Sequence, residues 1–363
     1  MRKRIKSGLS IIVKHFFVVS ILLSTLVVTA QKTNQSMVDS LIKVAESYKE
    51  KDIDKSRSLS QKALKLSLKL KYDNGTALAY KNLATLSMFQ SDIRTAIDTY
   101  NNAIVYFKKV NSIRGIADCY NNIALAFSMN SKFDSSLIYY QKNLTLEEQL
   151  DNKIAIAETM ENIGIAYYYH GHTKRAMEYF IKAATIFYTI KEYSLLYPTI
   201  VCISSVFSDL GYHRLSIRFH HLALIMAQHF ENIRVMSTCY NNIGFSYSNL
   251  GEYDKALEFL NYSIEVKDQL QDKEGMMISL GIIGSIYQAQ QRYDLSNQVY
   301  TNIIKISEEV DDKRQTAIGL TYIGENLRLQ GKFDKAINYY LHSLEILKPM
   351  RALNEIRDNY LYL

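Results

Sequence analysis

Large apolar residues recur every 40 positions along most of this chain, and a small residue directly follows nearly every one of them. The large apolar column comprises Leu83, Ile123, Ile163, Ile203, Ile243, Ile283, Ile323 and Leu363. The small column one position later comprises Ala84, Ala124, Gly164, Ser204, Gly244, Gly284 and Gly324. A third column, made only of alanine and serine, comprises Ser56, Ala96, Ser136, Ala176, Ser216, Ala256, Ser296 and Ala336. Self-similarity at a single period is the signature of a repeat protein, so we expect one array rather than several globular domains.

Each 40-residue unit is predicted to form two antiparallel helices. The first helix carries apolar or small residues at helical spacing, as in Tyr240, Ile243 and Tyr247. A glycine that can take the left-handed conformation then ends this helix, at Gly171, Gly211, Gly251 and Gly331. The second helix begins near Tyr253 in the same unit. Good N-cap residues also recur before the first helix of each unit, at Ser112, Asn152, Asn232, Asp272 and Asp312.

Residue size predicts how these helices pack. Two helices approach closely only where side chains are small, so we expect Gly244 to face Ala256 within a unit and Ser263 to face the next unit. Aromatic residues would fill the spaces between. In the first helices they are Phe127, Tyr167, Phe207, Tyr247 and Tyr287, and in the second helices Tyr100, Tyr140, Phe180, Tyr300 and Tyr340. His220 occupies the second aromatic column and is expected to be a packed substitute.

The combined pattern resembles the tetratricopeptide repeat, from about Met37 to Leu363. One full instance consists of Ile163, Gly164, Tyr167, Gly171, Ala176, Phe180 and Ala183. The resemblance implies an all-α, right-handed superhelical solenoid of antiparallel helix pairs. The period here is 40 rather than the family's common 34, which favours a variant with longer helices. HEAT repeats have a compatible period, but they do not require this spacing of small and aromatic residues.

We expect residues 31–363 to form about eight such repeats and the first helix of a ninth. The first repeat, over Met37 to Leu64, is unusually polar, as the end of an array requires where it meets water. Asn354 to Leu363 reads as the beginning of a ninth repeat without its small residue. We therefore also expect the array to continue in a longer protein.

Charge is distributed unevenly, because five of the basic residues lie in the first 14 positions. The net charge of +7 falls to +2 without Arg2, Lys3, Arg4, Lys6 and Lys14. A nearly neutral remainder offers no electrostatic reason to bind nucleic acid. The apolar run from Phe16 to Val28, followed by a small-residue site at Ala30, predicts a secretory signal peptide over residues 1–30. We therefore expect a periplasmic protein, with an uncleaved membrane anchor as the alternative.

No arrangement of residues in the sequence predicts catalysis, a cofactor or a metal site. Cys119, Cys202 and Cys239 fall within predicted first helices and are interpreted as small buried hydrophobic residues. His172 and His213 lie in comparable turns, where a weak metal site is conceivable, but no supporting ligand motif accompanies them. We expect both to be solvated turn residues.

In the family that the sequence resembles, the first helices line an inner wall that binds peptides or partner helices. Carried onto this chain, that wall comprises Met88, Phe89, Asn121, Leu125, Glu161, Ile165, Tyr168, Tyr169, Asn241, Phe245, Glu325 and Arg328. Asparagine amides would bond the backbone of an extended ligand, and aromatic residues would receive its side chains. The basic clamp that some members use for carboxylates is not reproduced, because Thr85 and Glu158 stand where asparagine and lysine are needed beside Lys81.

These patterns predict a non-catalytic, exported scaffold that binds a protein or peptide in a concave groove. Contact with a membrane would come only through an uncleaved N-terminus or a continuation beyond Leu363. The alternative is the periplasmic sensor portion of a longer signalling protein, a histidine kinase or a helix-turn-helix regulator. A hydrolase on a helical scaffold is disfavoured, since no nucleophile and base pair is present.

Overall fold

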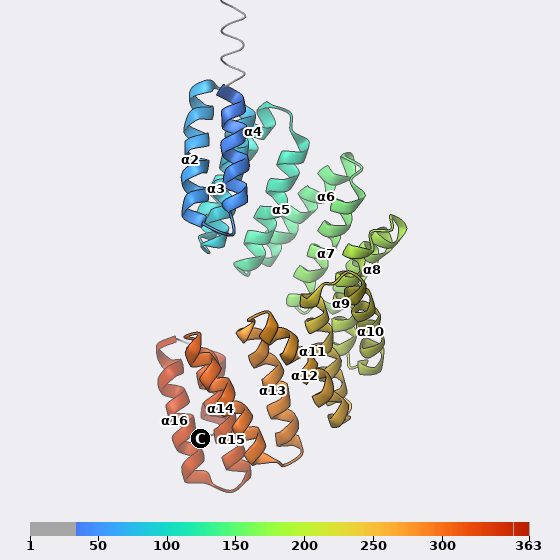
Figure 1. Ribbon diagram of the computed structural model, residues 1–363, viewed down its shortest axis with the longest axis vertical. Coiled ribbons are helices and arrows are strands. Elements are labelled where there is room, and N and C mark those ends of the chain that lie inside the picture. The colour runs from blue at the N-terminus through green and yellow to red at the C-terminus, as the bar shows by residue number, and fades with distance from the viewer. Residues whose placement is uncertain (1–33, 351, 363) are drawn as a thin grey trace, which may run out of the picture. The chain divides into compact units, whose positions relative to one another are not determined.

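A computed structural model describes residues 34–350 and 352–362, and these residues form 17 consecutive helices without a strand. The fold is therefore an all-α solenoid of antiparallel helix pairs, as the sequence predicts (Figure 1). The described residues divide into two compact units, one that ends at residue 171 and one that begins at residue 172. The predicted signal peptide, residues 1–30, lies outside the described residues. Within the described ranges, no helix has both the length and the apolar character needed to cross a membrane.

The first unit contains a helix over residues 34–48 and six further helices. These are α2 (Ile53–Leu70), α3 (Asp73–Phe89), α4 (Ile93–Lys109), α5 (Ile113–Met129), α6 (Phe133–Gln149) and α7 (Lys153–Tyr169). Each of α2 to α6 packs against the next helix along the chain, and the first helices α3 and α5 also touch each other directly (Figure 1). The first helices α3 and α5 are thus direct neighbours in this unit.

The second unit repeats the same arrangement. Its helices are α8 (Thr173–Thr189), α9 (Tyr193–Asp209), α10 (His213–His229), α11 (Ile233–Asn249), α12 (Tyr253–Gln269), α13 (Lys273–Ala289), α14 (Tyr293–Glu309), α15 (Lys313–Leu329), α16 (Phe333–Met350) and α17 (Leu353–Tyr362). Here too, the first helices touch, since α11 contacts both α9 and α13.

The turns between helices are more regular than the glycine pattern indicates. A residue with positive φ recurs every 20 positions from Lys71 to Gly331, both within and between repeats. Glycine occupies four of these positions, with φ between 74° and 80°, whereas residues such as Ser91 and Lys191 adopt the same conformation at φ 59° and 61°. The sequence therefore marks only the turns that use glycine, although the backbone bends in the same way at all of them.

Helix starts are fixed by the predicted N-caps. The side chains of Ser112, Asn152, Asn232, Asp272 and Asp312 each accept a hydrogen bond from the backbone N–H three residues later. These bonds satisfy donors that a helix otherwise leaves without partners. Several second helices, among them α6 and α12, begin without such a bond.

The core consists of the predicted columns. The isoleucines from Ile123 to Ile323 are buried, and Tyr100, Tyr140, Phe180, Tyr300 and Tyr340 are almost completely buried. A Cβ added to Gly244 would lie 2.7 Å from Leu260 Cγ and 3.1 Å from the Ala256 carbonyl oxygen, which confirms the expected close approach. His220 is fully buried, as expected for a substitute in the aromatic column. Its ring bonds Ser216 on α10 and the Asn242 amide on α11.

Cys119 and Cys239 are fully buried free thiols, as predicted, and Cys202 is half-buried. Burial raises the pKa of the Cys119 and Cys239 thiols to about 12. At neutral pH these groups are protonated and chemically inert, because the thiolate is the reactive form.

Candidate functional site

The predicted contact residues all lie on first helices, divided between the two units. In the first unit they lie on α3, α5 and α7, and in the second on α11 and α15. Several are open to solvent, with Tyr169 79% and Phe89 49% exposed. Leu125 and Phe245 are also exposed, whereas Ile165 and Tyr168 are half-buried. Tyr169, Phe89, Leu125 and Phe245 are thus accessible to solvent, and their role as ligand contacts stays a prediction.

Met88 is the clear exception. It is only 9% exposed and belongs to the core cluster around Tyr100, whose hydroxyl lies 3.6 Å from the Met88 sulfur. The prediction that Met88 lines a binding face is therefore wrong. The helical spacing placed it beside Phe89, but the packing of α4 against α3 turns Met88 inward.

Three predicted contact residues in the second unit are held by neighbours. Glu325 and Arg328 form an ion pair on α15, and Glu325 also accepts a hydrogen bond of 3.0 Å from the Tyr340 hydroxyl. The Arg328 hydrogen bond is the main cause that holds the pKa of Glu325 below its usual range. Asn241 accepts a hydrogen bond of 2.8 Å from Ser279 and donates one to Asn242. These side chains are already engaged within the fold.

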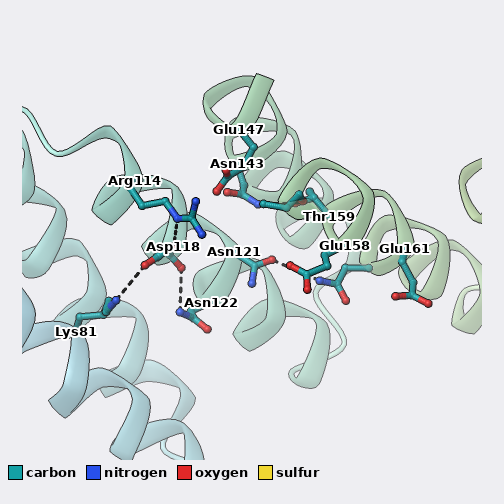
Figure 2. Close-up of a pocket in the computed structure, with 12 residues that line it drawn as sticks. Lys81, Arg114, Asp118, Asn121, Asn122, Asn143, Glu147, Glu158, Thr159 and Glu161 are labelled. Atoms are coloured by element: carbon teal, nitrogen blue, oxygen red, sulfur yellow. Dashed lines mark hydrogen bonds and ion pairs between the residues drawn. The ribbon is translucent and has the colours of Figure 1, made fainter. Parts of the chain in front are cut away.

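A polar pocket of about 430 Å³ lies in the first unit, between α5 and the helices α6 and α7 (Figure 2). Asn121 and Glu161 are the two predicted contact residues that it brings together. Its other lining residues are Lys81, Arg114, Asp118, Asn122, Asn143, Glu147, Ala155, Glu158, Thr159 and Asn162. The repeat pattern does not predict these residues as contacts.

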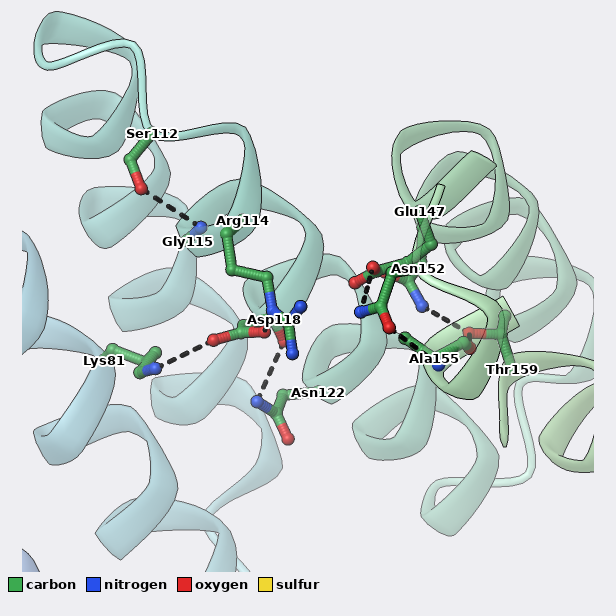
Figure 3. Close-up of polar contacts among 11 residues, drawn as sticks. Lys81, Ser112, Arg114, Gly115, Asp118, Asn122, Glu147, Asn152, Ala155 and Thr159 are labelled. Carbon is green, nitrogen blue, oxygen red and sulfur yellow. Dashed lines mark hydrogen bonds and ion pairs between the residues drawn. The ribbon is translucent and has the colours of Figure 1, made fainter. Parts of the chain in front are cut away.

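One side of the pocket is an ion-pair cluster. Asp118 on α5 lies 3.0 Å from the Lys81 ammonium on α3 and 3.5 Å from Nε of Arg114 on its own helix (Figure 3). Asn122 donates a hydrogen bond of 2.9 Å to the backbone carbonyl of Asp118. Lys81 and Arg114, the two basic residues of the pocket, therefore both face the same carboxylate.

The other side consists of polar residues buried between α6 and α7. Asn143 and Glu147 on α6 are each only 3% exposed. Asn143 donates a hydrogen bond of 2.7 Å to the Thr159 hydroxyl, which donates in turn to the Ala155 carbonyl. Glu147 accepts a hydrogen bond of 2.9 Å from the Asn152 amide (Figure 3). The Asn143 Oδ1 atom is buried, and no hydrogen bond to it is found among the described residues.

Carboxylates outnumber basic groups in this pocket by four to two. Glu158 is exposed, but the protein around its carboxylate partly excludes water and raises its pKa above the usual range, while Arg114 opposes the shift and Glu147 adds to it. The neighbourhood of Glu158 thus disfavours its negative charge. A further positive charge in the pocket would stabilise that charge.

A deviation in the repeat pattern could have revealed this site. The residues equivalent to Asn143 in the neighbouring repeats are Ala103 and Ala183. Those equivalent to Glu147 are Phe107 and Phe187. Replacing a buried alanine and a buried phenylalanine by asparagine and glutamate introduces groups that require polar partners. Asn143 and Glu147 differ in this way from the repeats on both sides, and such a pair of exceptions is a signal for a functional site.

The structure places the two turn histidines, His172 and His213, differently, and no group of three or more metal-ligating side chains is found among the described residues. His172 is exposed, as expected. His213 differs from the prediction, because it begins α10, is half-buried and has a buried Nδ1 atom. The interpretation of His213 as a solvated turn residue is therefore wrong.

Comparison with known protein families identifies the repeat. One family model described as tetratricopeptide repeat matches residues 115–188 and 275–348, and a second with the same description matches residues 237–269. No curated protein matches the chain.

Solved structures share the fold at low sequence identity. The quorum sensor NprR from B. thuringiensis has a TM-score of 0.68 and 13% identity, with 86% of this chain and 88% of that chain covered. A signal transduction ATPase with a tetratricopeptide repeat sensor, from Pyrococcus horikoshii, has a TM-score of 0.66 and 14% identity, with 90% and 50% covered. A Rap protein complexed with Competence and Sporulation Factor has a TM-score of 0.58 and 14% identity, with 90% and 96% covered.

Proposed function

Because this chain is built of tetratricopeptide repeats, we propose that it is a non-catalytic protein that binds a protein or peptide segment at the pocket between α5 and α7. The observation that carries the proposal is a set of amide side chains, Asn121, Asn122 and Asn162, along that pocket. An amide offers both donors and acceptors, which is what the backbone of an extended peptide requires.

The geometry of these amides supports a ligand role. Asn162 donates to Asn121 at 3.5 Å, which is long for a hydrogen bond, so little is lost when a peptide replaces it. Exposed Leu125 lies one helical turn beyond Asn121 on α5 and offers an apolar contact beside the polar pocket. Among structures of the same fold, NprR is described as a quorum sensor, and the Rap protein was crystallised with Competence and Sporulation Factor.

A peptide-display selection against the full chain tests this function. We expect peptides to be enriched over a blank surface, and to bind the Asn121→Ala/Asn162→Ala double variant at least about tenfold more weakly, as the loss of two hydrogen bonds implies. The control is Asn102→Ala, an exposed position on α4 that does not line the pocket. Failure to enrich any peptide, or equal binding to the double variant, would overturn the proposal.

We also propose that the protein is exported to the periplasm. The support is the basic and apolar pattern of residues 1–30, which ends in a small-residue cleavage site. N-terminal sequencing of the protein from a cell-envelope fraction is expected to begin at Gln31. A protein that retains Met1 and partitions with membranes would indicate an anchor instead.

A second candidate is the sensor portion of a longer signalling protein. The chain spans half the length of the Pyrococcus horikoshii signal transduction ATPase, whose description includes a tetratricopeptide repeat sensor. Reading the coding sequence past Leu363 tests this candidate. A membrane span followed by kinase or DNA-binding motifs would support it, and an immediate stop codon would exclude it.

A further inference from the structure

The α5–α7 pocket has more hydrogen-bond acceptors and negative charge than its own residues compensate. Asp118 is paired with both basic groups, Lys81 and Arg114. Glu158 makes no hydrogen bond or ion pair with any other residue in the described ranges. Glu147 is buried and receives one amide donor, from Asn152. The region around Glu147 and Glu158 is therefore left without a positive charge of its own beyond the shared Arg114.

The orientation of Asn143 gives the pocket a fixed, unused acceptor. The Thr159 hydroxyl donates its only hydrogen to the Ala155 carbonyl at 2.7 Å, so it can only accept from Asn143. This arrangement places the Asn143 nitrogen against Thr159 and its buried oxygen on the opposite side, towards α5 and the pocket that Asn143 lines (Figure 2). Since a buried acceptor without a partner destabilises the fold, a donor at this point would recover that loss.

A ligand group that satisfies these residues must donate hydrogen bonds and carry positive charge. An anionic group would face Glu147 and Glu158, and a neutral donor would leave their charge uncompensated. Guanidinium and ammonium groups have several N–H donors and no acceptor, which matches a pocket rich in oxygen atoms.

We infer that this pocket binds a basic side chain of the ligand, the guanidinium of arginine or the ammonium of lysine. The inference rests on the proposed peptide-binding function and adds a charge preference to it. Asn143 accepts from the cation, Glu147 and Glu158 supply the opposing charge, and Arg114 competes with the ligand for Glu158. The specificity is opposite to that of a basic clamp for carboxylates.

Small molecules test the inference without any peptide. We expect N-acetylarginine amide, and its lysine counterpart with a free side-chain amine, to bind the full chain in calorimetric titrations. N-acetylcitrulline amide has nearly the shape of the arginine compound but no charge, and it is expected to bind at least about tenfold more weakly. Glycinamide tests whether a free α-amino group binds as well. If glycinamide bound with the affinity of the arginine compound, the inference that the pocket binds a basic side chain would be overturned.

Matched variants connect this preference to the pocket. Glu158→Gln is expected to weaken the arginine compound at least about fivefold and to leave the citrulline compound unchanged. Glu148→Gln is the control, because Glu148 is exposed on the same helix as Glu147 but does not line the pocket. Arg114→Gln is expected to strengthen binding of the arginine compound, since it removes the competing cation. Equal affinities for arginine and citrulline, or no effect of Glu158→Gln, would overturn the inference.

The peptide selection separates the two proposals. If enriched peptides share a basic residue, and citrulline at that residue weakens binding at least about tenfold, both proposals are supported. If peptides are enriched and depend on Asn121 but carry no basic residue, peptide binding stands and the charge preference is wrong. If no peptide is enriched although the arginine compound binds, the pocket accepts cations and the peptide-binding function is wrong.

Discussion

Two regions of the molecule occupy the same repeat positions, 120 residues apart: one comprises α5, α6 and α7, and the other α11, α12 and α13. They differ in how their buried polar groups find hydrogen-bond partners. In the first region Glu147 leaves an open, acidic pocket with an unused acceptor on Asn143. In the second region Lys267 stands at the position of Glu147 and is 6% exposed. Its ammonium donates to the Gly275 carbonyl at 2.9 Å and to the Ser279 hydroxyl at 2.8 Å.

The acceptors around Lys267 correspond to those of the pocket. Gly275 and Ser279 are the repeat counterparts of Ala155 and Thr159. Burial lowers the pKa of Lys267, while the nearby Asp272 carboxylate opposes the shift. This part of the repeat can therefore hold a positively charged group, and in α11–α13 that group is the ammonium of Lys267. In α5–α7, where an acid replaces that lysine, we propose that the ligand supplies it.

Exchanging the charges should affect the two regions unequally. Lys267→Glu places a buried carboxylate beside the Gly275 carbonyl and near Asp272, and we expect it to lower the free energy of unfolding by about 3–5 kcal/mol. Glu147→Lys should cost less than about 1.5 kcal/mol, because the new ammonium finds the Asn143 oxygen and Glu158. Urea unfolding of both variants measures the difference. Lys267→Met, which removes the charge without adding another, is the control, and equal losses in the two exchanged variants would contradict the comparison.

A second difference concerns the asparagines Asn122 and Asn242. Asn122 bonds only its own helix among the described residues, whereas Asn242 bonds the buried ring of His220 on α10. Burial lowers the pKa of His220 from 6.5 to about 4. Below pH 6.5 the unfolded chain therefore takes up a proton that the folded chain refuses, so stability falls as the pH decreases from 6.5 to 4. At about 1.4 kcal/mol per pKa unit, the loss from this residue approaches about 3 kcal/mol.

His220→Phe should remove this part of the pH dependence, since Phe180 fills the same column in the preceding repeat. Unfolding free energies measured between pH 4 and pH 7 test the expectation. His342→Phe, at an exposed position on α16, should leave the pH dependence of stability as it is in the unmodified protein. An unchanged slope in His220→Phe would show that the histidine does not titrate as its burial predicts.

Backbone approach also differs between the regions, because Ala124 stands where the second region has Gly244. Gly244→Leu would force side-chain atoms against Leu260 and the Ala256 carbonyl, and we expect a loss of about 1–3 kcal/mol or more. Thermal unfolding measures the effect. An unchanged melting curve would mean that α11 and α12 do not pack as closely as described.

The smallest expected effect is a gain at Gly281, in the same region. A Cβ added there meets no atom within 4 Å, and the residue lies inside α13. Gly281→Ala should therefore raise the free energy of unfolding by about 0.5–1 kcal/mol, through lower backbone entropy in the unfolded chain. A loss of stability would contradict the prediction, because it would mean that the added methyl group clashes with a neighbouring atom.

Local and periodic features were predictable because each depends on few neighbouring residues. The isoleucine and small columns follow from the size of side chains at a helix crossing. N-caps such as Asn152 and Asp272 follow from the chemistry of a single helix start. The left-handed residues at Ser91 and Lys191 were not predictable in the same way, since the short connection between two packed helices imposes that conformation on residues that do not favour it.

The repeat, the helix pairs and the aromatic core follow from the sequence alone. Only the tertiary structure decided that Met88 is buried, that Asn241 is occupied by Ser279, and that Asn143 has an unused oxygen facing a pocket. The reason is that the burial and hydrogen bonding of a side chain depend on which residues of the neighbouring helices pack against it, as Tyr100 does against Met88 and Ser279 against Asn241. The 40-residue period shows which positions are equivalent, but it does not show which side chains at those positions have a hydrogen-bond partner.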